Sequence, residues 1–427
     1  MPSKVNDPNK TSWITVPEGS DFPIQNIPFG VFLTRDDVIT IGTRIGDTAI
    51  DLGALHQLGY FKDIPLTDDI FLQDTLNDFI SDGKQTWRAV RGRISSIFDV
   101  ENPELRDNEA HKEVILFTLD EIEMQMPVLI GDYTDFYSSK QHAKNIEELL
   151  NEGESDLLPN WLHIPIGYHG RSSSIVTSDI PIRRPHGQMF PANSANPVFG
   201  TSQKVDFEME VAFITTDANV LGDPVPVKEA EDYIFGMVLL NDWSARDIQK
   251  WEQEPLGAFL AKNFACSISP WIVIIDALEP FRTEGPVQEP TPFEYLQSEG
   301  HKNFDIHLEA SLITPDGSST VLSKSNAKYM YWNMAQQLAH HTINGCKVNS
   351  GDMMASGALS GDTPDSYSSL LELTKCGKEP VTLEDGGSRL FVNDNDTISI
   401  KGYCKNDKVR IGFGEVSNKL LPAITIK

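Results

Sequence analysis

The chain has 427 residues, of which 40% are hydrophobic and 23% are charged. This composition is typical of a globular protein, and the length exceeds what one ordinary core accommodates, so two domains are expected. The formal net charge of −27 excludes the basic footprint of a nucleic-acid-binding protein and is compatible with binding of cations.

The cysteines and the N-terminus bear on the cellular compartment. Four thiols are scattered without a Cys-x-x-Cys pair, which indicates a reducing cytosol rather than a disulfide framework. Residues 1–13 are polar and contain no signal-peptide pattern, and no apolar run reaches ~18 residues. We therefore expect a cytoplasmic protein that does not span a membrane.

Residues 1–126 are expected to form a small β domain with helices. Runs at 30–33 and 38–42 predict strands joined by a turn. Residues 75–98 have apolar side chains mostly three or four positions apart, which predicts a helix, and residues 102–123 are a second helical candidate. No catalytic constellation is found in this part. The pattern of residue types changes near residues 126 and 127, where we place the domain boundary.

The remainder, residues 127–427, is expected to be β-rich with a few helices. A strand at 128–130 leads into a polar, aromatic loop and then a helix to residue 150, and Asp135 and His142 share this connection. A helix is expected over 325–343. Short strands are expected at 353–356, 370–374, 397–402 and 409–413, and the second of them contains Glu372 within an apolar run.

The run VDFEMEVAF at 205–213 carries two carboxylates on one face of an expected strand, Glu208 and Glu210. Two such groups are costly to bury without a cation, although a solvent-facing strand would explain them equally well. Asp242 ends another apolar run. With Asp135 it completes an all-oxygen set that favours Mg²⁺, Ca²⁺ or Mn²⁺ over zinc.

Further polar groups accompany the acids. Arg246 and Gln249 share a face with Asp242 if residues 242–249 are helical, and Lys262 adds a third donor. Glu372 would need a partner if it is buried, for which a histidine is suited. The sequence has no G-x-S-x-G, H-E-x-x-H, P-loop or G-x-G-x-x-G motif, so serine hydrolase, zincin, kinase and dinucleotide functions lose their usual signatures.

The motifs at 130–142, 160–171, 206–213, 241–249 and 371–373 resemble the fumarylacetoacetase (fumarylacetoacetate hydrolase) family. The resemblance extends from residues 22–26 to residues 412–414. It implies a β-rich α+β fold, in which an SH3-like N-terminal barrel at 1–126 precedes a larger C-terminal mixed β-roll domain at 127–427. It also implies a homodimer.

The resemblance also implies roles for individual residues. The metal ligands for Mg²⁺ or Ca²⁺ would be Asp135, Glu208, Glu210 and Asp242. His142 would be the general base and Glu372 would orient it. The groups around the oxyanion would be Arg246, Gln249 and Lys262, and the substrate would contact Tyr137, Tyr168 and Gln249.

This chain departs from the family pattern in its expected substrate pocket. Asn151 stands where the family has an arginine, Gln253 replaces a tyrosine, and Ala358 replaces a threonine. An asparagine cannot reproduce the bidentate grip of an arginine on a carboxylate. Ala265 and Cys266 replace a glycine and a threonine after the lysine, which weakens the case for a second metal contact, because a thiol suits Mg²⁺ poorly.

The sequence thus leaves three hypotheses. The first is metal-dependent hydrolysis of a carbon–carbon bond in a 1,3-diketo acid, fumarylacetoacetate, as in tyrosine and phenylalanine catabolism. The second is a paralogue that uses the same site on another 1,3-dicarbonyl compound, for example in specialised metabolism. The third is a non-catalytic binding protein with a vestigial site, against which the presence of His142 and Glu372 argues.

Overall fold

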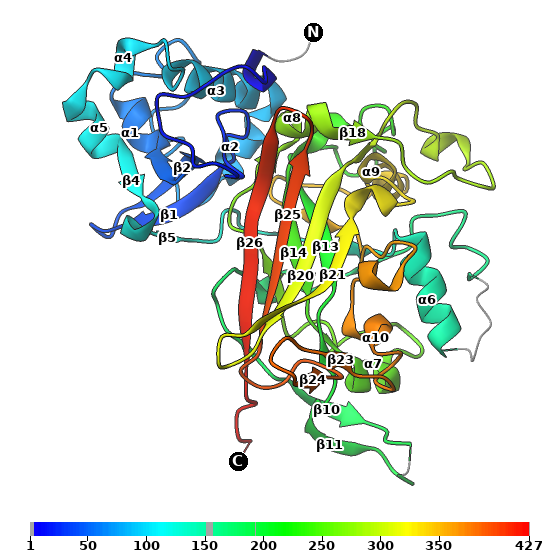
Figure 1. The fold of residues 1–427 in the computed structure, drawn as a ribbon. Coiled ribbons are helices and arrows are strands. Elements are labelled where there is room, and N and C mark those ends of the chain that lie inside the picture. The colour runs from blue at the N-terminus through cyan, green and yellow to red at the C-terminus, as the bar shows by residue number, and fades with distance from the viewer. Residues whose placement is uncertain (1–3, 151–156, 193, 427) are drawn as a thin grey trace.

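The computed structural model describes residues 4–150, 157–192 and 194–426. It is β-rich, and a smaller N-terminal part stands beside a larger C-terminal part (Figure 1). The expected β-rich α+β class is therefore confirmed. In the described residues, no helix is both long and apolar enough to cross a membrane.

The N-terminal part contains one antiparallel five-stranded sheet covered by helices, blue to cyan in Figure 1. The strands, in spatial order, are β4 (Leu116–Thr118), β3 (Thr48–Asp51), β2 (Ile39–Ile45), β1 (Gly30–Thr34) and β5 (Ile122–Met124). The helices are α1 (Leu52–Gln57), α2 (Asn77–Ser81), α3 (Gly83–Ile97), α4 (Pro103–Arg106) and α5 (Glu109–Ile115).

The helices of this part are shorter than their sequence periodicity predicts. The helix expected over 75–98 is divided at Gly83, which has a φ of 83° that favours glycine. Its apolar stripe is nevertheless buried, with Trp87, Val90 and Ile94 fully enclosed. The second candidate, at 102–123, ends in strand β4 instead of continuing as a helix, because residues 116–118 pair with β3.

The C-terminal part is built on two large mixed sheets. The first has the spatial order β7 (Gly167–His169), β6 (Tyr133–Phe136), β22 (Met353–Ala355), β13 (Met209–Thr215), β14 (Ile234–Asp242), β16 (Cys266–Ile268) and β8 (Ile175–Thr177), and β17 (Val273–Ile274) also pairs with β14. The second has the order β21 (Ser319–Asn326), β20 (Ile306–Ile313), β25 (Thr397–Lys405), β26 (Arg410–Leu421) and β9 (Ile182–Arg183).

Short elements complete this part. The two-stranded pairs are β10 (His186–Met189) with β11 (Val198–Thr201), β12 (Val205–Asp206) with β15 (Ser244–Ala245), β18 (Arg282–Thr283) with β19 (Asn303–Phe304), and β23 (Val381–Thr382) with β24 (Ser388–Arg389). The helices are α6 (Lys140–Leu150), α7 (Arg246–Glu252), α8 (Ile275–Leu278), α9 (Met334–Thr342) and α10 (Leu370–Leu373).

The two large sheets pack face to face around a common core. Every residue of β13 and β14 is buried, as expected of strands covered on both faces. Gly402 of β25 lies so close to Leu239 of β14 that a Cβ atom at position 402 would be 2.5 Å from a leucine methyl group. This close contact holds the second sheet against the strand that ends at Asp242.

The prediction of a helix over 325–343 is wrong for the first half of that range. Strand β21 continues to Asn326, and α9 begins only at Met334, after the Asn333 side chain accepts a hydrogen bond from the Gln336 amide. The predicted stripe of Met330, Met334 and Leu338 is buried all the same. Tertiary pairing of the polar run 323–326 with β20 prevails here over local helix propensity.

Candidate active site

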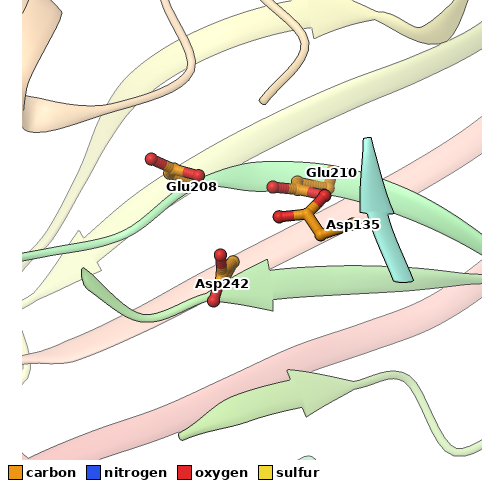
Figure 2. Close-up of side chains that lie close together, drawn as sticks. All are labelled: Asp135, Glu208, Glu210 and Asp242. Carbon is orange, nitrogen blue, oxygen red and sulfur yellow. The ribbon is translucent and has the colours of Figure 1, made fainter. Parts of the chain in front are cut away.

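Four carboxylates converge from β6, β14 and the N-terminal end of β13 in the first large sheet. We call them the acidic cluster: Asp135, Glu208, Glu210 and Asp242. One carboxylate oxygen from each lies within 4.8 Å of those of the other three, and all four residues are buried. Figure 2 shows the side chains pointing toward one another.

Strand pairing explains why these acids meet. Met209 pairs with Asn241 in the antiparallel β13–β14 ladder, and the Asp242 amide donates to the Glu208 carbonyl, so residues 208 and 242 lie opposite each other. Glu210, two positions along the chain from Glu208, uses the same face. β6 reaches the site through β22, where Ala355 pairs with both Asp135 and Ala212.

The acidic cluster is electrostatically incomplete. Oδ1 of Asp135 and both carboxylate oxygens of Glu210 are buried without a hydrogen-bond partner. Burial, and then the neighbouring carboxylates, raise the pKa of Glu210 well above its usual range, and the pKa of Asp135 is raised in the same way. Unpartnered, acceptor-only oxygens at this spacing fit a hard divalent cation.

Lys262 occupies the other side of the cluster. Its Nζ lies 2.8 Å from Oε2 of Glu208 and 2.7 Å from Oδ2 of Asp242. Burial alone would lower the pKa of this ammonium, but Asp242 and Glu208 outweigh burial and raise it, so Lys262 stays charged. The lysine therefore pairs with two of the acids and leaves Asp135 and Glu210 without a cationic partner at hydrogen-bond distance among the described contacts.

Arg246 begins helix α7, and its guanidinium is buried. Nε donates to Oδ2 of Asp206 at 2.9 Å, and Nη1 lies 2.7 Å from Oε1 of Glu208 and donates to Oε1 of Gln249 at 3.2 Å. The last contact agrees with the expectation that Arg246 and Gln249 share a helix face. Nη2 is buried without a hydrogen-bond partner and is thus available to an incoming acceptor.

His142 and Glu372 form a buried pair beside the acidic cluster. Nδ1 of His142 lies 2.9 Å from Oε2 of Glu372, and the two side chains are 4% and 0% exposed. Burial would raise the pKa of Glu372, but His142 and the hydrogen bonds to the carboxylate outweigh it and lower the pKa. Because Nδ1 faces the carboxylate, Nε2 of His142 is left to face other groups.

Glu372 was expected in a strand, and this expectation is wrong. It lies on the single turn α10, whose first residues are held by the Ser369 side chain and by Asp206. Ser369 and Ser360 donate to the Glu372 carboxylate, and so does Asn145 at 2.7 Å. Sequence analysis missed these donors, although Asn145 stands three positions after His142 and so lies on the same face of α6.

Two tyrosines border the site. The Tyr168 hydroxyl donates to Oδ2 of Asp242 at 3.2 Å, and the Tyr137 ring meets the His142 ring edge to face at 5.5 Å between centroids. The backbone that leads into Tyr137 packs tightly against Gly357, which has a φ of 75°: a Cβ atom there would lie 2.0 Å from the Phe136 carbonyl oxygen.

The residues that depart from the family pattern lie at separate places in the structure. Ala358 is buried in the turn that connects β22 to Ser360. Gln253 caps the C-terminal end of α7 and is half-buried. Asn151 lies outside the described residues. The Cys266 thiol donates to Oδ1 of Asp242 at 3.1 Å, so it supports a cluster carboxylate from behind.

Comparison with known proteins finds matches over nearly the whole chain. Residues 25–127 match the model described as Fumarylacetoacetase N-terminal, and residues 133–421 match Fumarylacetoacetate (FAA) hydrolase C-terminal. The chain is 47% identical to the fumarylacetoacetase of Homo sapiens over 97% of its own length and 99% of the relative's. The Arabidopsis thaliana fumarylacetoacetase is 45% identical over 96% and 98% of the two lengths.

A solved structure agrees at the level of the fold. The fumarylacetoacetate hydrolase from psychrophilic Exiguobacterium antarcticum superposes with a TM-score of 0.51 at 17% sequence identity, and the match covers 93% of this chain and 99% of that one. Both family models and the relatives' nearly complete coverage lead to one conclusion: this chain belongs to the fumarylacetoacetase family.

Proposed function

We propose that this protein hydrolyses fumarylacetoacetate to fumarate and acetoacetate, a step of tyrosine and phenylalanine catabolism. The proposal rests on one juxtaposition, in which a histidine–carboxylate pair lies beside a buried, incompletely neutralised acidic cluster. The family and the fumarylacetoacetases that are 45–47% identical to the chain support the same reaction. The proposal also includes a division into two domains, residues 1–126 and 127–427. It further includes assembly as a homodimer and a cytoplasmic location.

The acidic cluster is proposed to hold Mg²⁺ or Ca²⁺. Its donors are all oxygens, and three of them are buried without a partner, which suits a hard cation. When bound, the ion would polarise the carbonyl oxygens of the 1,3-dicarbonyl group and stabilise the negative charge that leaves with acetoacetate.

His142 is proposed as the general base. Glu372 holds Nδ1, so Nε2 takes a proton from water as the water oxygen bonds to the carbonyl carbon. The carbon–carbon bond then breaks, its electron pair leaves on the acetoacetate carbon, and the proton held by His142 returns to that product. In the tetrahedral intermediate the former carbonyl oxygen is negatively charged. Nη2 of Arg246, the Gln249 amide and the Lys262 ammonium would donate hydrogen bonds to it.

The metal requirement gives the direct test of this proposal. Purified protein, stripped of metal with a chelator, is expected to lose turnover of fumarylacetoacetate and to regain it with Mg²⁺ or Ca²⁺. The measurement follows loss of substrate absorbance together with the release of fumarate and acetoacetate. Turnover that survives chelation contradicts the metal role, and good metal binding without turnover contradicts the substrate.

Two observations favour a second candidate, the paralogue acting on another 1,3-dicarbonyl compound. Gln253 and Ala358 lack the hydroxyl groups of the family's tyrosine and threonine, and Ala358 is enclosed in the turn that leads to Ser360. A substrate whose hydrogen-bonding groups differ from those of fumarylacetoacetate would suit such a pocket. A non-catalytic binding protein is the remaining alternative, and any turnover excludes it.

Restoring the missing hydroxyl separates the two substrate assignments. If fumarylacetoacetate is the substrate, Gln253→Tyr is expected to lower its KM about 2–10-fold with little change in kcat, as one added hydrogen bond would. Gln253→Phe is the matched control, because it adds the ring without the hydroxyl. Equal KM values for the two variants would show that position 253 does not bind this substrate through a hydroxyl.

A further inference from the structure

Asp206 is a buried carboxylate that sequence analysis assigned no role. It lies at the end of β12, and its side chain is fully enclosed. Four donors surround its two oxygens. Oδ1 accepts from the amides of Phe207 at 2.9 Å and Leu370 at 2.7 Å, and Oδ2 accepts from the Leu371 amide and from Arg246 Nε, both at 2.9 Å.

Three of these donors belong to two separate parts of the candidate active site. Arg246 starts α7 and extends a free Nη2 as well as an Nη1 that contacts Glu208. Leu370 and Leu371 start α10, the turn that carries Glu372. Asp206 thus contacts neither the acidic cluster nor His142 among the contacts described, yet it holds Arg246, which contacts Glu208, and the turn whose Glu372 contacts His142.

The other contacts of α10 reach it mainly through the side chain of Glu372, to which Ser360 and Asn145 donate. Ser369 accepts from the Glu372 amide and donates to its carboxylate, and an isolated bridge joins residue 369 to Glu208. A single helical turn has no propagating hydrogen bonds to stabilise it, so its position depends on such outside contacts. Asp206 supplies a charged acceptor to the first two amides of the turn, and charge-assisted hydrogen bonds are stronger than neutral ones.

We propose that Asp206 is a positioning residue, which fixes Arg246 and the Glu372-bearing turn relative to each other and so sets the reactive geometry of His142. The inference rests on the proposed function for its kinetic test only. Neither oxygen of Asp206 is spare, because each has two donors. An ordinary buried ion pair would need the arginine alone.

The isosteric variant Asp206→Asn exposes this role. Its amide nitrogen cannot accept a hydrogen bond. In one orientation it opposes the Leu370 amide, and in the other it opposes the Leu371 amide and Arg246. Either way α10 loses one of its two amide contacts with residue 206, so kcat is expected to fall about 10–100-fold, the usual effect of removing such a supporting contact, while KM changes less than about threefold.

A spectroscopic signal reports the geometry independently of turnover. Nδ1 of His142 lies 2.9 Å from Oε2 of Glu372 in a buried pair, so a proton on it should give a low-field proton resonance, assigned by its absence in His142→Ala. Asp206→Asn is expected to shift or broaden that resonance. Wild-type protein that fails to cleave fumarylacetoacetate would refute the proposed function, yet this measurement would still decide the role of Asp206.

Asp276→Asn is the matched control. Asp276 is 5% exposed and pairs with Arg88 of α3, whose side chain is 56% exposed, so the variant removes the charge of a buried carboxylate paired with an arginine outside the candidate site. It should lower thermal stability without changing kcat or the His142 resonance. The proposal is overturned if Asp206→Asn keeps both the wild-type kcat and the wild-type resonance, or if the control changes them equally.

A failure to fold is also decisive. Asp206→Glu keeps the charge but moves the carboxylate by one methylene group, and it is expected to fold and to show a reduced kcat. If neither Asp206 variant folds while Asp276→Asn does, Asp206 is required for folding as such, and the positioning role falls.

Discussion

Replacing His142 with alanine is expected to reduce the rate of fumarylacetoacetate cleavage by about 10²–10⁴-fold, the range that general base catalysis supplies. The imidazole lies beside the acidic cluster but is not part of it, so Mg²⁺ affinity should change less than about threefold. Steady-state kinetics and calorimetric titration with Mg²⁺ on the same preparations check the two parts of this prediction.

Two further variants make the result specific. Glu372→Gln should also lose rate, and the double variant with His142→Ala should lose little more than His142→Ala alone, because Glu372 acts through the imidazole. His111→Ala is the control, since His111 contacts Tyr60 in the N-terminal part of the chain. Wild-type turnover in His142→Ala would refute its assignment as the base, whatever the metal affinity.

The sequence predicted the face of the strands better than the ends of the elements. Glu208 and Glu210 share a face because of the two-residue period of a strand, a purely local property. Glu208 in fact precedes β13, whose first residue is Met209, yet an isolated bridge to Ser369 keeps it extended. The convergence with Asp135 follows from the parallel pairing of β6 with β22, a contact between residues more than two hundred positions apart.

The surroundings of Glu372 show what local patterns cannot predict. A short apolar run with one acid fits a strand and a buried helical turn equally well, because four residues are too few to show a period. The contacts that decide for the turn are tertiary: Asp206 accepts from its first amides, and Ser360 donates to its carboxylate. These groups lie 164 and 12 residues away from their partners in the chain.

Replacing Glu210 with glutamine is expected to have opposite effects on metal binding and on the stability of the metal-free protein. Both Glu210 oxygens are buried without a hydrogen-bond partner among three other acids. Loss of a cluster carboxylate should weaken Mg²⁺ binding and, at a subsaturating concentration, reduce turnover by about 10²–10³-fold, which corresponds to the several kcal/mol that a metal ion contributes. Calorimetry and kinetics at fixed Mg²⁺ measure both.

The metal-free protein should respond in the other direction. An uncompensated buried charge costs stability, so its neutral isostere should raise the melting temperature measured in chelator. Added Mg²⁺ raises the melting temperature of the wild type by mass action and should do so much less in Glu210→Gln. The wild type is therefore expected to melt below Glu210→Gln in chelator and above it in Mg²⁺.

Asp396→Asn is the control for the expected rise in the melting temperature of metal-free Glu210→Gln. Asp396 is also fully buried, but Arg389 donates to it twice, at 2.7 and 2.9 Å, so removing its charge leaves a cation without its partner and should lower the melting temperature with and without Mg²⁺. If Glu210→Gln also melts lower in chelator, the acids of the cluster are compensated within the chain itself. The electrostatic argument for a cation would then fail, even with the family resemblance intact.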